Sequence, residues 1–131
     1  MNHLSISHVH HIAIICNNYL CSKKFYCEVL GFEIIRETYR QPRDSYKLDL
    51  RLPDGTQIEL FSFPGAPKRP SYPEAQGLRH LAFAVDDIDE SVAYLISQDI
   101  AVEAIRIDEL TNKRFTFFND PDGLPLELYE N

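Results

Sequence analysis

The sequence predicts an α+β fold built from two βαβββ modules, and the strongest reason is an internal repeat. The residues His11-Ile12-Ala13-Ile14 open the first copy, and His80-Leu81-Ala82-Phe83 open the second. A glutamate in strand-like sequence closes each copy, since Glu59 follows His11 by 48 residues and Glu127 follows His80 by 47. Two copies of one supersecondary unit predict two similar halves within a single domain over 1–131.

The first module is expected at 8–63. A short β-branched run at 9–15 predicts a buried strand, and apolar residues at helical spacing predict a helix at 18–30. Asn17 or Asn18 can cap the start of this helix, and Gly31 can end it in the left-handed conformation. Three more strands are predicted at 32–39, 46–52 and 57–63, with a turn at Pro53-Asp54-Gly55 before the last of them.

The second module, expected at 78–130, repeats this order. A strand at 79–85 precedes a helix that ends near Gln98. Asp86 or Asp87 can cap this helix, and Asp87 with Glu90 has the spacing of a capping box. The predicted apolar stripe of the helix is Ile88, Val92, Leu95 and Ile96, and the predicted strands after it are 102–107, 114–118 and 124–129. A strong turn signal at 119–123 separates the last two strands.

A proline-rich linker at 64–77 joins the two modules. Its prolines recur at every third position, which favours an extended and stiff connection (Pro64, Pro67, Pro70 and Pro73). A loop of this length in a compact domain is also a candidate border of a functional site.

Composition excludes some partners. The formal net charge of −7 argues against nucleic acid, which requires clustered cations to neutralise its phosphates. The chain has three cysteines without a Cys-x-x-Cys pair, which is typical of free thiols in a cytoplasmic protein. No basic leader followed by an apolar run opens the sequence, and no apolar run is long enough to span a membrane. We therefore expect a cytoplasmic protein that binds a small molecule and no membrane.

Strand alternation places the repeated residues on one face. Successive side chains of a strand point to opposite faces, so His11 shares a face with Ala13, and His80 shares a face with Ala82. The bulky aliphatic neighbours take the other face, which we expect to pack on the helices. The face of the histidines therefore carries small residues and leaves room for a ligand.

The matched positions make His11, Glu59, His80 and Glu127 candidate ligands of one metal ion. Taken singly, each is more simply a solvated residue on the wet side of an antiparallel sheet. The repeat favours the site, because it provides the same pair of residue types twice. Two imidazoles and two carboxylates suit Zn, Ni, Co, Mn or Fe(II) and differ from a structural thiolate zinc site.

Three other histidines compete with His11 as ligands. His8 and His10 fall on the opposite face of the predicted strand, and neither matches His80 in the repeat. We interpret His10 as a structural residue or a residue that supports a ligand, and His3 as part of the N-terminal tail.

At these positions the chain resembles the vicinal oxygen chelate superfamily, and especially glyoxalase I and small glyoxalase-like bacterial proteins. The resemblance covers about 9–130. The motifs that carry it are Phe25-Tyr26-x-x-x-Leu30-Gly31-Phe32, Gly77-x-x-His80, and Asn119-Asp120-Pro121-Asp122-Gly123 followed by Glu127. It implies a curved sheet of the glyoxalase/bleomycin-resistance type, with helices on the outer face.

The resemblance also implies a metal site. In glyoxalase I the ligands come from the first and last strands of each module, at positions that here are His11, Glu59, His80 and Glu127. One Ni, Co or Zn ion per site is expected, and Mn or Fe is also compatible. Glyoxalase I forms dimers whose site usually lies between subunits, so a homodimer is expected here, although other members form the site within one chain.

The implied activity is that of a divalent-metal-dependent lyase or isomerase of the lactoylglutathione lyase type. Such an enzyme acts on a small α-carbonyl compound or its thiol adduct through an enediolate whose oxygens the metal binds. The resemblance assigns Glu127 as the base that moves the proton, and Glu59 as a ligand and possible partner base.

Two positions depart from glyoxalase I. Ile15 and Phe63 stand where that enzyme usually has an Arg and an Asn that hold glutathione. Arg40, Arg43 or Lys47 could instead bind an acidic substrate, although solvated surface charge is their commoner role.

Two other classes of function stay open. One is a different metalloenzyme, such as an Fe(II) dioxygenase or an epimerase. The other is a protein that only binds or sequesters a small molecule, and the retained ligands argue against it.

Overall fold

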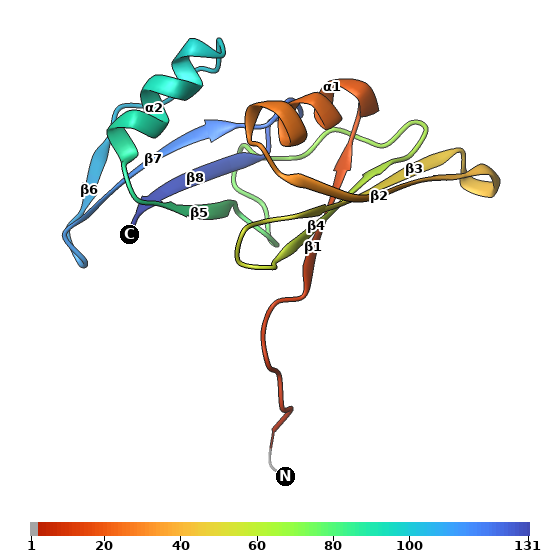
Figure 1. Ribbon diagram of the computed structural model, residues 1–131, viewed down its shortest axis with the longest axis horizontal. Helices are drawn as coiled ribbons and strands as arrows, with labels where there is room; N and C mark the ends of the chain where they lie inside the picture. Colours follow the sequence, from red (N-terminus) through yellow and green to blue (C-terminus); the bar gives the residue numbers. More distant parts are fainter. Residues whose placement is uncertain (1–2) are drawn as a thin grey trace. The chain divides into compact units, whose positions relative to one another are not determined.

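The structure, a computed structural model that describes residues 3–131, divides into two compact units (Figure 1). The first unit ends at Ala66 and the second begins at Pro67. Each unit contains a four-stranded sheet and a helix in the order βαβββ, which confirms the predicted α+β class and its repeat.

The elements lie close to their predicted positions. In the first unit the strands are β1 (His11–Cys16), β2 (Glu33–Arg40), β3 (Ser45–Arg51) and β4 (Gln57–Ser62), and the helical segments are α1 (Tyr19–Lys24), the π-helical η1 (Phe25–Val29) and the 3-10 turn η2 (Gln41–Arg43). In the second unit the elements are β5 (Leu81–Val85), α2 (Ile88–Ser97), β6 (Arg106–Asp108), β7 (Lys113–Asn119) and β8 (Pro125–Glu130).

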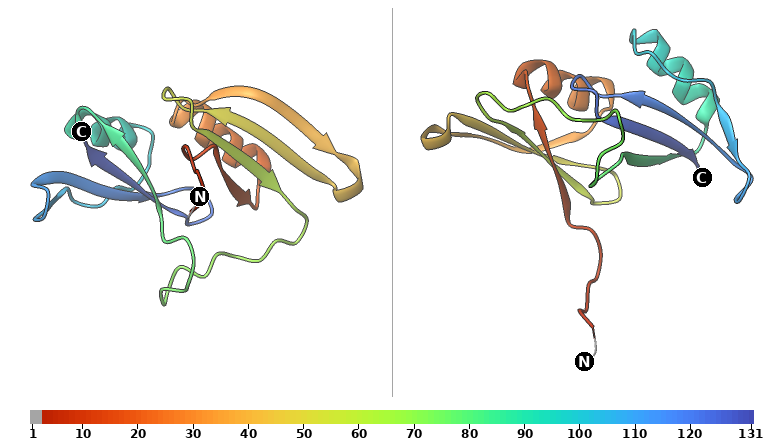
Figure 2. Two further views of the ribbon diagram at one scale, coloured as in Figure 1. Left: turned by 90° about the horizontal axis from the view of Figure 1, so that it is seen from below. Right: turned by 180° about the vertical axis from the view of Figure 1, so that it is seen from behind.

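The two sheets have the same topology. Their strand orders are β1-β4-β3-β2 and β5-β8-β7-β6, so the first strand of each module lies at the edge of its sheet, next to the last strand of that module. These neighbours, β1 with β4 and β5 with β8, pair in parallel, while the other pairs are antiparallel. Figure 2 shows α1 across one face of the first sheet and α2 across one face of the second.

Each core lies between a helix and the aliphatic face of its sheet. In the first unit Leu48, Leu50, Ile58 and Leu60 are fully buried, as is Tyr26. In the second unit the fully buried residues include Ile88 of α2 and Leu126 of β8. Burial alternates along the central strands, as expected for a sheet with one face toward the core.

The helix caps follow the sequence. The side chain of Asn18 accepts a hydrogen bond from the Cys21 amide (3.0 Å), and that of Asp87 accepts one from the Glu90 amide (2.9 Å). Gly31 has φ +78°, the left-handed conformation that ends the first helical segment. In α2, Ile96 of the predicted apolar stripe is 58% exposed, so this residue does not join the core of its unit.

The predicted helix at 18–30 widens in its second half. Leu30 donates its amide hydrogen bond to the carbonyl of Phe25, five residues earlier, which is the pattern of a π-helix. Phe25 and Tyr26, although adjacent, are both buried within this wide turn. The widening therefore brings two neighbouring aromatic rings into the core.

The strand predicted at 102–107 is shorter than expected. The regular pairing of β6 with β7 covers only 106–108, and Val102 makes an isolated bridge to Phe118. Between these points the Glu103 amide donates to the carbonyl of Phe117 (3.0 Å), and the hydroxyl of Thr116 donates to the carbonyl of Glu103 (2.7 Å).

The linker is less extended than its prolines predict. Turns lie at 64–65 and 71–74, with an extended stretch between them. Arg69 causes the chain to fold back, because its guanidinium donates to the Ser71 hydroxyl and to the carbonyls of Leu78 and Arg79. From Pro67 onward the linker belongs to the second unit. Among residues 3–131 the structure has no helix long and apolar enough to cross a membrane.

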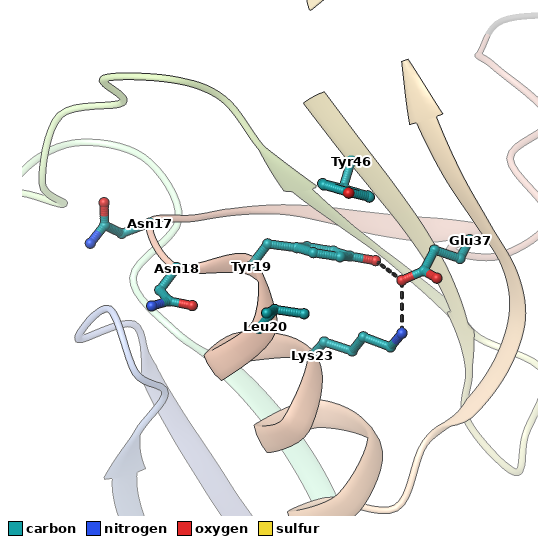
Figure 3. Close-up of a pocket in the computed structure, with 7 residues that line it drawn as sticks. All are labelled: Asn17, Asn18, Tyr19, Leu20, Lys23, Glu37 and Tyr46. Carbon is teal, nitrogen blue, oxygen red and sulfur yellow. Dashed lines mark hydrogen bonds and ion pairs between the residues drawn. The ribbon is translucent and has the colours of Figure 1, made fainter. Parts of the chain in front are cut away.

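A polar network joins α1 to the sheet beside a cavity of about 670 Å³ (Figure 3). The rings of Tyr19 and Tyr46 stack at 4.3 Å, and Glu37 accepts hydrogen bonds from the Tyr19 hydroxyl and from Lys23 (2.8 Å). Burial, followed by the hydrogen bond to Glu37, raises the pKa of Tyr19. The hydrogen bonds from Lys23 and Tyr19 lower the pKa of Glu37. On β3, Tyr46 stands at every second position with Leu48 and Leu50 and therefore lies on the same face of the sheet as these core residues. This cavity is thus on the helix side of the sheet.

We expect Glu37→Gln to destabilise the protein by about 1 kcal/mol at pH 7, since it weakens two hydrogen bonds to a charged group at a partly exposed position. Because the folded-state pKa of Glu37 lies below its ordinary value of 4.5, this contribution is present at neutral pH and is lost as the pH falls below 4.5. Urea unfolding of both proteins at pH 7 and at acid pH measures the difference. Tyr39→Phe, which removes an exposed hydrogen bond to Asp44, is the control and should cost less. An equal loss at both pH values would contradict the role of the carboxylate.

Candidate functional site

Each unit brings one predicted histidine to its predicted glutamate. In the first unit His11 Nε2 lies 3.5 Å from Glu59 Oε2, and in the second His80 Nε2 lies 3.7 Å from Glu127 Oε1. We call each pair a half-site. The glutamate side chains are only 16% and 14% exposed, whereas those of His11 and His80 are 43% and 29% exposed.

The two half-sites share one register. On β4, Glu59 pairs with Ala13, and on β8, Glu127 pairs with Ala82. His11 and His80 each stand two residues before the paired alanine, so they lie on the same face, diagonal to the glutamate. The alanines are exposed, as expected for the open face of the sheet. The structural repeat therefore reproduces the chemistry of the half-site as well as the fold.

The donor atoms fit a divalent metal. With metal–ligand bonds of about 2.0–2.2 Å, neighbouring N and O ligands lie roughly 2.8–3.6 Å apart. The observed separations of 3.5 and 3.7 Å are close to this range. Among residues 3–131 the structure forms no group of three or more His, Cys, Asp or Glu side chains placed to hold a metal. Each unit by itself thus supplies two ligand-type side chains.

His10 contacts the first half-site from the neighbouring position. Its Nδ1 lies 2.9 Å from Nδ1 of His11, and the two rings meet edge to face. In the tautomer in which His11 Nδ1 carries the hydrogen, Nε2, which lies 3.5 Å from Glu59, keeps the lone pair that a metal would bind. His8, by contrast, contacts Ser7 (2.5 Å).

The surroundings of the two glutamates differ. Lys47 Nζ lies 3.2 Å from Asp49 and 3.9 Å from Glu59, so Glu59 stands among charged groups. The strand positions facing Glu127 are aromatic instead: Phe117 pairs with Glu127 on β7, and its ring meets that of His80 edge to face at 5.0 Å. Burial raises the pKa of Glu127 above its ordinary value, although His80 and Arg106 partly oppose this shift.

The positions that depart from glyoxalase I are apolar in the structure. Ile15 is 55% exposed on the open face of β1. Phe63 stacks on Phe61 at 5.8 Å, and the guanidinium groups of Arg40 and Arg43 lie over its ring at 5.7 and 4.7 Å. Arg40 also donates to Ser45 (3.2 Å). Of the three cations proposed for an acidic substrate, Lys47 is thus engaged by carboxylates and the two arginines stack on aromatic rings.

A cavity of about 520 Å³ opens beside His80 in the second unit. Part of the linker lines it, together with Arg79, Arg106 and Phe117. Sequence reasoning named the linker as a border of a site but did not single out these two arginines. The position of Arg79 directly before His80 was the available signal, whereas Arg106 reaches the cavity only through the pairing of β6 with β7.

The chain belongs to the Glyoxalase/Bleomycin resistance protein/Dioxygenase superfamily, whose family model matches residues 8–128. Members of this superfamily typically bind a divalent metal ion and are often enzymes. The chain is 63% identical over 127 residues to "Uncharacterized protein YaeR" of Escherichia coli strain K12, covering 97% of this chain and 98% of that protein. It is 61% identical to "Uncharacterized protein YwkD" of Bacillus subtilis strain 168, covering 93% and 95%.

Solved structures agree in fold. A glyoxalase family protein from Enterococcus faecalis has a TM-score of 0.90 at 50% identity, covering 97% of this chain and all of that one. More distantly, the chain is 29% identical to a 2-epi-5-epi-valiolone epimerase of Actinomyces sp, over 92% of this chain and 77% of that protein. A lactoylglutathione lyase from Agrobacterium tumefaciens has a TM-score of 0.73 at 20% identity, covering 98% and 96%, and shares the fold.

We expect Glu127→Gln to leave the chelator-treated protein at least as stable as the wild type at pH 7. Burial raises the folded-state pKa of Glu127, so its carboxylate opposes folding above that pKa, and this cost is relieved as the pH falls. Glu130→Gln is the matched control on the same strand. The pKa of Glu130 is lowered by hydrogen bonds from Arg114, so removing its charge should destabilise the protein at pH 7. Thermal unfolding compares the two, and a clear loss of stability in Glu127→Gln would contradict the expectation.

Proposed function

We propose that the protein is a divalent-metal-dependent lyase or isomerase of the glyoxalase type. The proposed substrate is a small α-carbonyl compound or its thiol adduct. The observation that carries the proposal is the repeated half-site, in which His and Glu stand in the same register in both modules with N–O separations of 3.5 and 3.7 Å. A structural role for one such pair is plausible, but two identical pairs facing the open side of their sheets favour a shared ligand.

The proposed metal ligands are His11, Glu59, His80 and Glu127, and Ni, Co or Zn is the proposed ion. When bound, the ion supplies Lewis acidity toward the oxygens of the substrate. This donor set of nitrogen and oxygen is compatible with all three ions.

We assign the proton transfer to Glu127. Its carboxylate is largely buried against Phe117, and its raised pKa brings it nearer to the neutral range in which a general base works best. Glu59 lies among charged groups instead, beside Lys47 and across the sheet from Asp49. This difference supports Glu59 as a ligand and Glu127 as the base.

The substrate is proposed to lack the usual glutathione contacts. Ile15 offers an exposed aliphatic side chain, and Phe63 is stacked with Phe61 beneath two arginines. Neither side chain can donate the hydrogen bonds that an Arg or Asn would provide. Methylglyoxal with glutathione, the substrates of lactoylglutathione lyase, is the reference assay. Because the usual glutathione contacts are missing, other α-carbonyl compounds and thiols are tested after it.

We expect metal-dependent turnover, with glutathione or with another thiol or α-carbonyl compound, that is lost in Glu127→Gln. Chelator-treated protein is reloaded separately with Ni, Co, Zn and Mn, and thioester formation from methylglyoxal and glutathione is followed. Removing a general base lowers turnover by roughly 100-fold or more. Metal content, measured by elemental analysis of the same samples, shows whether Glu127→Gln retains the ion.

Glu130→Gln controls for loss of charge on the same strand, because residue 130 falls on the opposite strand face from Glu127. Full turnover in Glu127→Gln would exclude its role as the base. Bound metal without turnover on any tested pair would leave the metal site in place and move the search to other substrates.

We further propose that the active form is a homodimer in which each metal takes one half-site from each subunit. Mixing inactive His11→Ala with inactive Glu127→Gln should then restore activity, because a mixed dimer has one site free of both changes. With random exchange, about a quarter of the sites regain all four ligands. Mixing His11→Ala with Glu59→Gln is the control, since every shared site then carries a change. Absence of recovery after verified subunit exchange would show that each site forms within one chain.

An epimerase is the second candidate, favoured by the 29% identity to the Actinomyces enzyme. Epimerisation also removes a proton beside a carbonyl and returns it, so the same base would serve. Metal-dependent exchange of a substrate α-proton for solvent deuterium, without thioester formation, would favour this alternative.

A further inference from the structure

We propose that the cavity beside His80 binds the oxyanion group of an acidic substrate, a carboxylate or a phosphate. The reactive end of that substrate would reach the half-site of His80 and Glu127. This inference rests on the proposed function and deepens it by naming the class of substrate. The cavity, at about 520 Å³, has the size of a small-molecule site.

The lining of this cavity has the opposite sign of charge to the whole chain. Three arginines and two glutamates contribute to it, so it carries a net positive charge of one, while the chain carries −7. The charged residues that line the cavity are Arg69, Arg79, Arg106, Glu74 and Glu103. His80 of the half-site also lines it. A local excess of cations in an acidic protein attracts small anions to this cavity.

Arg79 offers a guanidinium ready to bind an anion. It is exposed, and within residues 3–131 the structure shows no hydrogen bond or ion pair made by its side chain. Arg79 directly precedes His80, so an anion held here lies one residue from the proposed metal ligand. Guanidinium groups bind carboxylates and phosphates through two parallel hydrogen bonds.

Arg106 provides a second guanidinium, held by aromatic rings. Its charged group lies 5.0 Å from the ring centre of Phe115 and 5.8 Å from that of Phe117. One nitrogen also contacts Glu103 at 3.0 Å, in an ion pair whose side chains are 55% and 59% exposed. Such an exposed pair is weak, and it leaves other N–H groups of Arg106 for a ligand.

Arg69 is a positioning residue in this scheme. Its guanidinium is occupied by the Ser71 hydroxyl and the carbonyls of Leu78 and Arg79. Ser71 in turn donates to the carbonyl of Gly123 (3.4 Å). These bonds hold the linker against the second unit and fix the backbone at Arg79, so the wall of the cavity forms before a ligand binds.

The test is an NMR titration of the chelator-treated, ¹⁵N-labelled full chain at constant ionic strength. The probes are succinate, inorganic phosphate and the neutral analogue succinamide. We expect saturable shifts in the amides of 69–79 and of Arg106 with an oxyanion and none with succinamide. Comparing succinate with phosphate shows which oxyanion the cavity prefers.

The variants separate this cavity from general charge effects. Arg79→Gln and Arg106→Gln should each weaken binding by about tenfold, because each removes charge-assisted hydrogen bonds to the ligand. Arg36→Gln removes the same charge from an exposed position in the first unit and should bind like the wild type. Glu103→Gln should strengthen binding, since it removes the competing carboxylate of Arg106. The ¹⁵N spectrum of each variant reports that it is folded.

Three results would overturn the inference. They are the absence of saturable shifts with both oxyanions, equal weakening by Arg36→Gln and Arg79→Gln, and binding of succinate only after metal is restored, which would indicate chelation at the ion. Because the titration uses metal-free protein, a positive result stands even if metal-dependent turnover is absent. Metal-dependent turnover with no oxyanion binding would instead retain the proposed function and reject this cavity.

Discussion

The parallel pairing of the first and last strands of each module is the constraint on which the candidate site depends. It places Ala13 opposite Glu59 and Ala82 opposite Glu127, and so sets each histidine diagonal to a glutamate on one face. A slip of one residue would turn the glutamate toward the helix and expose its aliphatic neighbours. The complete burial of Ile58, Leu60 and their counterpart Leu126 opposes such a slip. The hydrophobic core therefore also fixes the geometry of the half-sites.

Sheets of the same strand order surround the two glutamates with different side chains. Across the sheet from Glu59 stands Asp49, with Lys47 close to both, whereas Phe117 stands across from Glu127. Burial raises the pKa of Glu127, whereas the neighbours of Glu59 are charged side chains. A duplicated scaffold can thus give one residue type two different surroundings through the side chains of a neighbouring strand.

Local and periodic features of the structure could be predicted from the sequence, and features set by long-range hydrogen bonds could not. The caps at Asn18 and Asp87 and the half-site residues follow from spacing and repetition. β6 begins only at Arg106, and the Glu103 carbonyl accepts a hydrogen bond from the Thr116 hydroxyl of β7, a contact that no pattern around 102–107 reveals. Likewise, the prolines of the linker indicated an extended chain, but the hydrogen bonds of Arg69 fold it against the second unit.

The fold of the linker has a consequence for how the protein can diversify. One wall of the cavity beside His80 comes from the linker, which connects the two modules and belongs to neither sheet. Arg69 holds this segment in place. Insertions or substitutions between Tyr72 and Gly77 can therefore reshape that wall while the strands and their ladders remain intact. Natural variation is expected to be tolerated in this segment as long as its anchor persists, so new ligand preferences can arise there at little risk to folding.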